Sequence, residues 1–407
     1  MRLTRRQLAI GAGAALAAPA LVRPARAGAD PGITDTEIKL GQTMPFSGPA
    51  SAYSSFGKAM AGYMKMVNEK GGVHGRQINL IQYDDGYSPP RTIEQTRRLV
   101  EQDKVFAMFA PEGTAPNVVI RKYLNEKRVP QIFAISGIAS FGDPKRFPWT
   151  IGWQPTFEIE GQVFTKYIKQ VKPDARIAIL YQNDDLGKDY IRGIRRELGD
   201  KADKMIVGMQ SYEITDPTIE SQIVALHDSG ADTFINVSTP KFAAQGIRKV
   251  FDIGWKPLHM LSYASASAQV VMKPAGAEKG IGIISSTYFK DPTDPRWAND
   301  PEYLEWVAFM GKYVPGGDTK DIYYVIGSMM ANTMVQFLQQ CGRDVTRESM
   351  MREVSHIDYH VPMILPGIRV QTAPDNWFPI RALQLERFDG ESFVLFGDPI
   401  VGVPNPV

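Results

Sequence analysis

Short apolar runs alternate with amphipathic segments over the first part of the chain. Between two of these runs, apolar residues fall on one helical face at Val119, Ile120, Tyr123 and Leu124. The runs that we expect to be strands are Ile38–Met44, Ile78–Tyr83, Val105–Ala110 and Val129–Ile135. Strands that alternate with helices predict a parallel sheet joined by right-handed crossovers.

The alternation starts afresh after Ile151, which predicts a second α/β unit. Helical segments such as Gly187–Leu198 and Ala243–Phe251 separate its apolar runs. The strands expected in this unit are Ile177–Tyr181, Met205–Met209, Phe234–Val237, Met260–Tyr263 and Ile281–Ile284. No short repeat of the solenoid kind is evident, so the chain reads as two α/β units.

Beyond Tyr288 the pattern changes from alternation to helices followed by strands. The expected helices are Tyr303–Tyr313, Tyr323–Gln340 and a shorter one near Arg347–Val354. Two apolar runs, Ile380–Phe388 and Phe393–Phe396, then flank Asp389 and Gly390, which is a hairpin signal. We therefore expect the chain to return to the first unit and to finish on the second.

The N-terminus has the parts of an export signal. Paired arginines, Arg5 and Arg6, precede an apolar run over Leu8–Val22, and a small-x-small triplet ends at Ala27. The alternative, a membrane anchor, fits less well because the run is short and is interrupted by Pro19. We expect a twin-arginine signal peptide over residues 1–27. No cysteine follows it to carry a lipid, so the mature protein should be free in the periplasm.

Charge excludes one class of partner once the signal is removed. The 407-residue chain has a net charge of +2, but residues 1–27 hold five arginines and no acid, so the mature chain carries −3. Nucleic-acid binders need clustered positive charge, and nothing here argues for one. The composition, 43% hydrophobic and 22% charged, is that of a folded globular protein, and the length suffices for two domains.

The sequence contains no convincing catalytic or cofactor motif. It lacks a phosphate loop ending in Gly-Lys-Ser/Thr, a Gly-x-Ser-x-Gly elbow and a His-Glu-x-x-His pair. Cys341 is the only cysteine, so no intrachain disulfide forms, and an inert thiol is the commoner role for such a residue. We expect no catalytic residue, no metal and no cofactor.

Two acidic pairs and one histidine pair are the residues that could still carry chemistry. Asp84-Asp85 and Asp184-Asp185 each follow an expected strand and could bind a metal or act as acids, although such pairs more often form turns and helix caps. His356 and His360 are the closest histidines, but Pro362 follows at once and argues against a shared metal on a helix.

The stretch Phe106–Ser140 is the strongest candidate for a binding site. It reads as strand, glycine turn, helix, strand and glycine turn, with Thr114 placed to cap the helix and Pro116 in its first turn. Free amides, a hydroxyl and the positive end of a helix dipole suit a carboxylate. Ser136 and Gly137 would bring further hydroxyl and amide groups to the same edge of the sheet. The alternative is a pair of ordinary turns between buried strands.

Polar and aromatic residues recur at the C-terminal ends of the expected strands, where open α/β sheets bind their ligands. Hydroxyls, amides and rings together suit an anionic head on a flat or apolar body. The set comprises Ser47, Tyr53, Phe56, Thr114, Ser136, Trp153, Thr239, Tyr263 and, on a helix, Tyr324.

Several local motifs make the chain resemble the periplasmic branched-chain-amino-acid-type binding proteins, the solute receptors of ABC importers. The motifs are Ser47-Gly48-Pro49, Asn68 to Val73 with Gly75, Tyr83-Asp84-Asp85, Val171-Lys172-Pro173 and Gly230-Ala231-Asp232. The likeness extends over essentially the whole mature chain. It implies a type I periplasmic binding fold with two doubly wound parallel-sheet lobes joined by a three-crossover hinge.

The resemblance also implies how the chain divides and what it meets. Lobe 1 would be residues 30–151 and 288–361, and lobe 2 residues 152–287 and 362–407. The receptor would be a monomer that closes on its ligand and delivers it to ABC permease subunits in the inner membrane. A ligand sensor for a membrane signalling protein has the same fold and stays open as an alternative, as does a secreted hydrolase or isomerase.

In that family the carboxylate is held at two turns, which here are Gly113-Thr114 and Ile135-Ser136-Gly137. The aromatic residue after Ser-Gly-Pro lines the cleft, and Tyr53 and Phe56 are the candidates for it. Amino-acid receptors add an acid on the second lobe, but the matching region, Leu261–Ser265, has none.

This departure shapes the expected ligand. The other second-lobe contact falls near Thr239, which carries no charge either. We expect a small carboxylate without an α-amino group, such as a hydroxybenzoate or a phenylpropenoid acid. A branched-chain or other amino acid is the alternative, because Glu158, Glu160 or Asp185 could reach the cleft.

Overall fold

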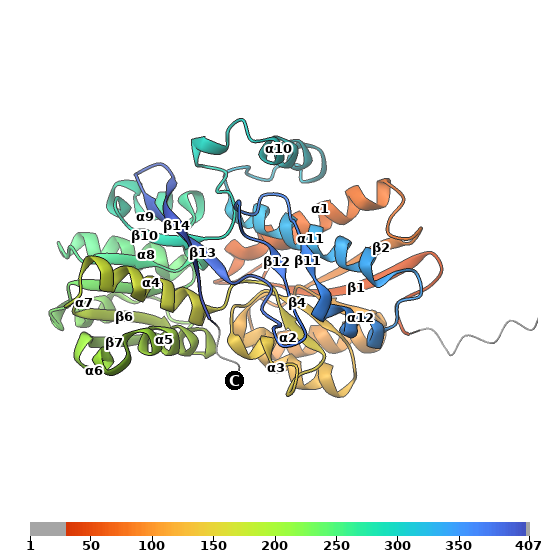
Figure 1. Ribbon diagram of the computed structural model, residues 1–407, viewed down its shortest axis with the longest axis horizontal. Coiled ribbons are helices and arrows are strands. Elements are labelled where there is room, and N and C mark those ends of the chain that lie inside the picture. The colour runs from red at the N-terminus through yellow and green to blue at the C-terminus, as the bar shows by residue number, and fades with distance from the viewer. Residues whose placement is uncertain (1–29, 404–407) are drawn as a thin grey trace, which may run out of the picture.

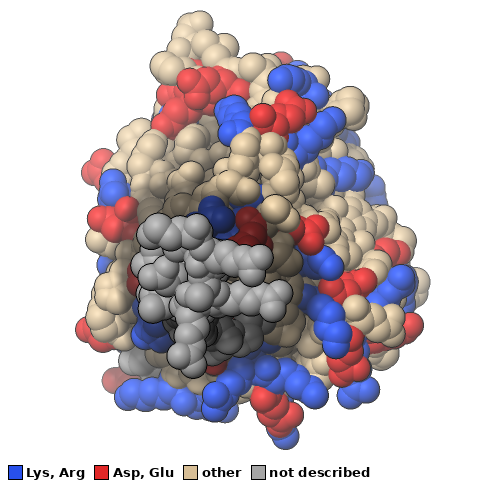
Figure 2. Space-filling model, turned by 90° about the vertical axis from the view of Figure 1, so that its right-hand side faces the viewer, with Lys and Arg blue, Asp and Glu red and all other residues tan. Residues whose placement is uncertain are grey.

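The computed structural model describes residues 30–403, which form two α/β lobes side by side (Figure 1). The expected signal peptide, residues 1–27, lies outside the described residues. Within residues 30–403 no helix combines the length and the apolar character that a membrane span requires. Acidic and basic side chains are interspersed over the face of the molecule in Figure 2.

Lobe 1 is built on a five-stranded sheet in which every pair of neighbouring strands is parallel. From edge to edge its strands are β2 (Gln77–Asp84), β1 (Glu37–Met44), β3 (Ala107–Phe109), β4 (Gln131–Ala134) and β5 (Thr150–Gly152). Its helices are α1 (Ser54–Glu69), α2 (Pro89–Arg97), α3 (Thr114–Glu126), α10 (Pro301–Tyr313), α11 (Ile322–Cys341) and α12 (Arg347–Glu353). The sequence alternation predicted this sheet.

Lobe 2 is built on a seven-stranded sheet that is parallel except at one edge. From edge to edge its strands are β14 (Phe393–Val401), β13 (Ala382–Phe388), β10 (Ile284–Thr287), β9 (Leu258–Leu261), β8 (Thr233–Val237), β6 (Ile177–Gln182) and β7 (Ile206–Tyr212). Its helices are α4 (Phe157–Val171), α5 (Asp185–Leu198), α6 (Ala202–Met205), α7 (Glu220–Asp228), α8 (Pro240–Asp252) and α9 (Lys273–Ala275). The predicted hairpin is confirmed as β13 and β14, which pair antiparallel with each other and add to β10.

The chain crosses between the lobes three times: between β5 and α4, after β10, and between the short strand β12 (Val370–Gln371) and β13. β12 pairs with β11 (Asp358–Tyr359). The second crossing segment lies against the stretch that precedes β12, because the Leu365 amide donates to the Tyr288 carbonyl (3.0 Å). The three-crossover architecture is thus present, and the exact residue at each lobe boundary stays a prediction.

Helix α11 returns to lobe 1 and lies directly against α1. The two helices touch at a glycine, since a Cβ at Gly327 would meet the Phe56 carbonyl oxygen at 2.6 Å. This close approach fixes the rotation of α11 about its own axis. It decides which of the two neighbouring tyrosines, Tyr323 or Tyr324, can face the other lobe.

Three local expectations were wrong. β9 ends at Leu261, because the Ser262 side chain accepts the Ala264 amide and starts a 3-10 turn that contains Tyr263. β10 begins at Ile284, since Ile281 is 61% exposed in a turn beside Gly282 (φ +89°). Thr114 is not the N-cap of α3, as described below.

Candidate functional site

A cavity of about 30 Å³ lies between the lobes at the C-terminal ends of the lobe 1 strands. Six of its lining side chains are aromatic: Tyr53, Phe56, Tyr87, Phe157, Tyr263 and Tyr323. Among the described residues none of the lining side chains is Lys, Arg or His. The cavity is therefore lined mainly by aromatic rings, with only a few polar side chains among them.

The lobe 1 floor is the turn before α3, and a glycine shapes it. Gly113 is the N-cap at φ +100°, where a Cβ would lie 2.5 Å from Cε2 of Tyr87. The Asn117 side chain holds the turn by donating to the carbonyls of Pro111 (2.7 Å) and Gly113 (2.8 Å). Thr114 is thereby moved into the first helical position, which corrects its expected role as the cap.

The Thr114 hydroxyl, freed from capping, meets the Ser136 hydroxyl from the end of β4 at 2.7 Å. Both residues are buried and both line the cavity. Since one hydroxyl donates to the other, one hydroxyl hydrogen of the pair is left to serve a ligand. The positive end of the 13-residue helix α3 lies at the same place. This arrangement suits a carboxylate.

Three rings form the lobe 1 wall. Tyr53 stacks on Phe56 with ring centroids 5.5 Å apart. Tyr323 meets both rings edge-on, with its centroid 5.1 Å from the centroid of each. The hydroxyls of Tyr53 and Tyr323 both donate to the Ala264 carbonyl of lobe 2, at 3.2 and 2.9 Å. These bonds cross the cavity mouth, so the lobes are in contact around it.

The lobe 2 wall is Tyr263 with a buried acid behind it. Its ring lies near Phe157, and its hydroxyl donates to the Pro155 carbonyl (2.8 Å). Its amide donates to Glu160 (2.9 Å), and Glu160 also accepts the Ser286 hydroxyl (2.6 Å). Burial, against these hydrogen bonds, raises the pKa of Glu160 to about 7. Glu160 thus orders the wall and does not itself line the cavity.

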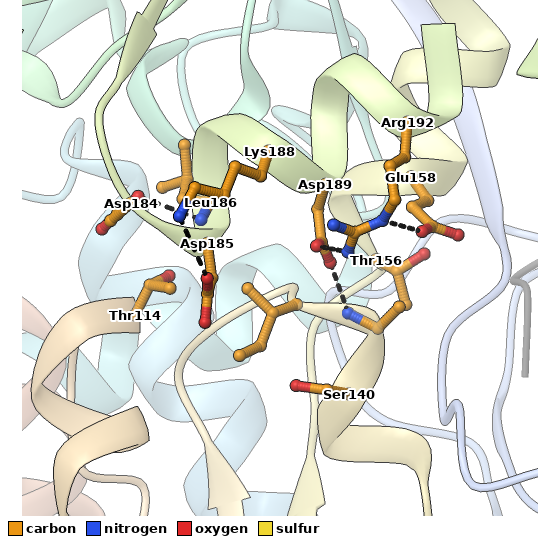
Figure 3. Close-up of polar contacts among 12 residues, drawn as sticks. Thr114, Ser140, Thr156, Glu158, Asp184, Asp185, Leu186, Lys188, Asp189 and Arg192 are labelled. Carbon is orange, nitrogen blue, oxygen red and sulfur yellow. Dashed lines mark hydrogen bonds and ion pairs between the residues drawn. The ribbon is translucent and has the colours of Figure 1, made fainter. Parts of the chain in front are cut away.

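A second contact between the lobes lies beside the cavity (Figure 3). Asp189 on α5 accepts the Ala139 amide of lobe 1 at 2.6 Å, and Arg192 pairs with both Asp189 and Glu158. Figure 3 shows Asp189 between Arg192 and the loop that carries Ser140. Glu158 is therefore engaged in this contact.

Eight of the twelve expected site residues line the cavity: Tyr53, Phe56, Gly113, Thr114, Ile135, Ser136, Thr239 and Tyr263. Four do not. Ser47 is exposed and donates to Asp84 (2.5 Å), and Trp153 is buried, donating to Thr333 (3.1 Å). Gly137 lies behind the lining, where a Cβ would meet the Pro155 oxygen at 2.6 Å.

Tyr324 is the fourth, and its neighbour Tyr323 lines the cavity in its place. The contact of α11 with α1 sets the rotation of α11 about its axis, and so decides which tyrosine faces the cavity. Ile326, three residues on, lines the cavity from the same helical face, and this spacing is the signal that could have separated the two tyrosines.

Sequence reasoning missed the other eight lining residues, namely Tyr87, Glu112, Gln154, Phe157, Leu186, Ala264, Tyr323 and Ile326. Tyr87 and Glu112 lie in turns beside residues that were recognised, where only the three-dimensional turn shows which side chain faces inward. Burial raises the pKa of Tyr87 overall, and the Thr114 amide, which faces the Tyr87 hydroxyl, lowers it. A ring hydroxyl therefore occupies the start of α3 in this closed arrangement.

The acidic pairs are engaged in local structure. Asp84 accepts the amides of Ser47 (3.1 Å) and Gly86 (3.0 Å), and Asp85 accepts the Thr92 hydroxyl (2.8 Å). Asp184 caps α5 through the Leu186 amide (2.9 Å). Of the two roles weighed for these pairs, turns and caps describe what the structure shows.

An interlobe cavity in a hinged two-lobe α/β fold defines a solute-binding protein. The sequence matches the family described as "Periplasmic binding protein" over residues 37–389, and the chain belongs to that family. The fold is the type I periplasmic binding fold, as the motifs predicted.

Individual relatives are distant but cover most of the chain. A "Leu/Ile/Val-binding protein homolog 8" of Brucella suis biovar 1 (strain 1330) is 21% identical over 390 residues, 92% of each chain. A branched chain amino acid ABC transporter protein from Thermus thermophilus with bound valine superposes with a TM-score of 0.81 at 16% identity, over 91% of this chain and 98% of that one.

A third relative differs in the ligand its title names. A fatty acid ABC transporter substrate-binding protein from Thermomonospora curvata has a TM-score of 0.74 at 19% identity, over 92% of this chain and 95% of that one. At these identities the solved structures establish the fold alone.

Proposed function

We propose that this chain is the periplasmic solute-binding receptor of an ABC importer and that it captures a small aromatic carboxylate. The observation that carries the proposal is the Thr114–Ser136 hydroxyl pair at the start of α3, facing a cavity lined by six rings. A carboxylate head fits the pair and the helix dipole, and a flat body fits the rings. Export to the periplasm, cleavage after Ala27 and delivery to permease subunits as a monomer belong to the same proposal.

Lobe 2 supports a ligand without an α-amino group. The acid behind the Tyr263 wall, Glu160, is covered by Tyr263 and accepts bonds from Tyr263, Ser286 and Tyr190. An ammonium entering from that side would find no free anion, and an unpaired buried charge is costly.

The test is a thermal-shift screen of the purified protein against hydroxybenzoates, phenylpropenoid acids, aliphatic acids and amino acids. A ligand at one hundred times its Kd adds about 2.7 kcal/mol of stability. We expect aromatic acids to raise the melting temperature most. Shifts with leucine or valine and none with any aromatic acid would contradict the proposal. Conversion of the stabilising compound by the purified protein would instead favour a secreted enzyme.

An amino acid is the second candidate, and one observation favours it. Glu112 of lobe 1 lines the cavity, so an acid is present after all, although on the opposite lobe from the one expected. Whether this carboxyl faces an ammonium or an anion separates the two ligand classes.

A further inference from the structure

Glu112 has an open hydrogen-bonding position inside the cavity. It lies in the turn between β3 and α3, two residues before Thr114, and is 4% exposed. Its Oε2 atom is buried and has no hydrogen-bond partner within residues 30–403. A buried carboxyl oxygen without a partner is costly, which points to a ligand group that completes it.

The neighbouring tyrosine hydroxyls do not fill this position. Those of Tyr53 and Tyr323 donate to the Ala264 carbonyl, and that of Tyr263 donates to the Pro155 carbonyl. The Tyr87 hydroxyl accepts a bond from the Gln182 side-chain nitrogen (3.5 Å), and neither it nor the Tyr288 hydroxyl donates to Oε2 of Glu112. Within residues 30–403, the position at Oε2 of Glu112 is therefore open to a group of the ligand.

The charges that face Glu112 are acidic. Burial first, and then the carboxylate of Asp85, raise the pKa of Glu112 well above its ordinary value, while the Gly113 amide lowers it. Burial, together with charges that include Glu112, also raises the pKa of the surrounding tyrosines. These tyrosines are Tyr53, Tyr87, Tyr263, Tyr288 and Tyr323. No cation among the described lining residues offsets these acids.

An anionic ligand and an ionised Glu112 are therefore incompatible. Two negative charges held close together, away from water, repel each other strongly. A protonated Glu112 removes the repulsion and gains an O–H group that needs an acceptor. A ligand carboxylate is such an acceptor, and a hydrogen bond to a charged group is stronger than a neutral one.

We propose that Glu112 stays protonated in the cleft and donates its carboxyl hydrogen to the carboxylate of the ligand. Binding then retains one proton on Glu112, which comes from solvent whenever the free protein has lost it. The inference rests on the proposed function and deepens it, because it makes Glu112 a specificity residue for anions. An ammonium ligand would need the ionised form and would give the opposite pH dependence.

The experiment measures Kd for benzoate, 4-hydroxybenzoate and leucine by calorimetry from pH 6 up to the highest pH at which the protein stays folded. For the aromatic acids we expect Kd to rise as the pH passes the pKa of Glu112, approaching tenfold per pH unit above it. Titration in phosphate and in Tris should show uptake of up to one proton at the high end of the range.

Glu112→Gln is the key variant, because its amide donates a hydrogen bond but does not titrate. It should bind the aromatic acids within about threefold of wild type at pH 6 and show a flat profile over the same range. Glu391→Gln, at the exposed tip of the β13–β14 hairpin, is the matched control and should follow wild type. The wild-type profile and the proton uptake test the proposal even if Glu112→Gln folds poorly.

The outcomes separate the two claims. Benzoate binding with the same Kd at every pH, with no proton uptake and with the same Kd again in Glu112→Leu, which has no hydrogen to donate, would overturn the role of Glu112 and leave the proposed function standing. Leucine binding that tightens with rising pH and is lost in Glu112→Gln would overturn both, since Glu112 would then pair with an ammonium. Failure of all aromatic acids to bind at any pH would also overturn both.

Discussion

The two faces of the cavity differ in how far the protein satisfies their polar groups. On lobe 1, the Thr114–Ser136 pair keeps one hydroxyl hydrogen to give, and Glu112 keeps an open carboxyl oxygen. On lobe 2, Tyr263 uses its hydroxyl on Pro155 and its amide on Glu160.

This difference assigns separate tasks to the lobes. Groups left open bind the polar head of a ligand, whereas groups already paired give a rigid apolar wall that needs no ligand to be ordered. Under the proposed function, lobe 1 is the anchoring face and lobe 2 the closing face.

The largest expected effect concerns Glu160, which supports the closing face. Its folded-state pKa of about 7 lies above the ordinary 4.5, so the folded state binds more protons than the unfolded state between these values. The contribution of Glu160 to the free energy of unfolding is fully present below about pH 4.5 and is lost as the pH rises through 7. Glu160→Gln should remove up to about 3 kcal/mol of the fall in stability between pH 5 and pH 8.

Urea unfolding of wild type and Glu160→Gln at several pH values measures this difference, and the comparison cancels the other buried acids. If the free energy of unfolding changed with pH equally in the two proteins, Glu160 would not be a buried acid of the folded state.

The next largest effect is expected when a hydroxyl is removed from the anchoring face. Thr114→Val keeps the side-chain shape but removes the hydroxyl, and a hydrogen bond to a charged group is worth about 1.5–3 kcal/mol. The Kd for an aromatic acid should rise by about one to two decades. The control is Thr239→Val on the closing face, whose hydroxyl lies 3.3 Å from that of Tyr212 and should matter less.

Calorimetric titration of both valine variants gives the comparison. An unchanged Kd in Thr114→Val would take Thr114 out of the site, and equal losses in both variants would remove the distinction between the faces.

The smallest effect concerns closure. Tyr323→Phe loses the 2.9 Å bond to the Ala264 carbonyl, worth about 0.5–1.5 kcal/mol, so the Kd should rise roughly two- to tenfold. Tyr324→Phe should leave it unchanged. Small-angle scattering with and without ligand should also show a smaller change in Tyr323→Phe than in wild type. A larger loss in Tyr324→Phe than in Tyr323→Phe would contradict the placement of α11.

Much of the anchoring face was predictable, because its determinants are local. Glycine turns, hydroxyls and strand ends lie next to one another in the sequence, and Gly113, Thr114 and Ser136 indeed line one cavity. The prediction was still wrong for the N-cap of α3, for which two neighbouring residues were candidates. Gly113 took the cap position expected for Thr114, because only glycine fits beneath Tyr87 at that backbone angle.

The rest depends on contacts between distant segments. The choice of Tyr323 over Tyr324 follows from where α11 meets α1, across more than two hundred residues. Glu160 reaches Tyr263 and Ser286 only through the folded sheet of lobe 2. No pattern within a short window carries this information, so the sequence left the second-lobe acid and its partners undecided.

The central claim is that the cavity binds its ligand by a carboxylate on lobe 1. The most direct test is calorimetric titration of wild type with 4-hydroxybenzoate and with its methyl ester, which keeps the ring and hydroxyl but removes the negative charge. The account predicts measurable binding of the acid and at least about a hundredfold weaker binding of the ester. Equal binding of the two, or binding of leucine alone, would contradict it.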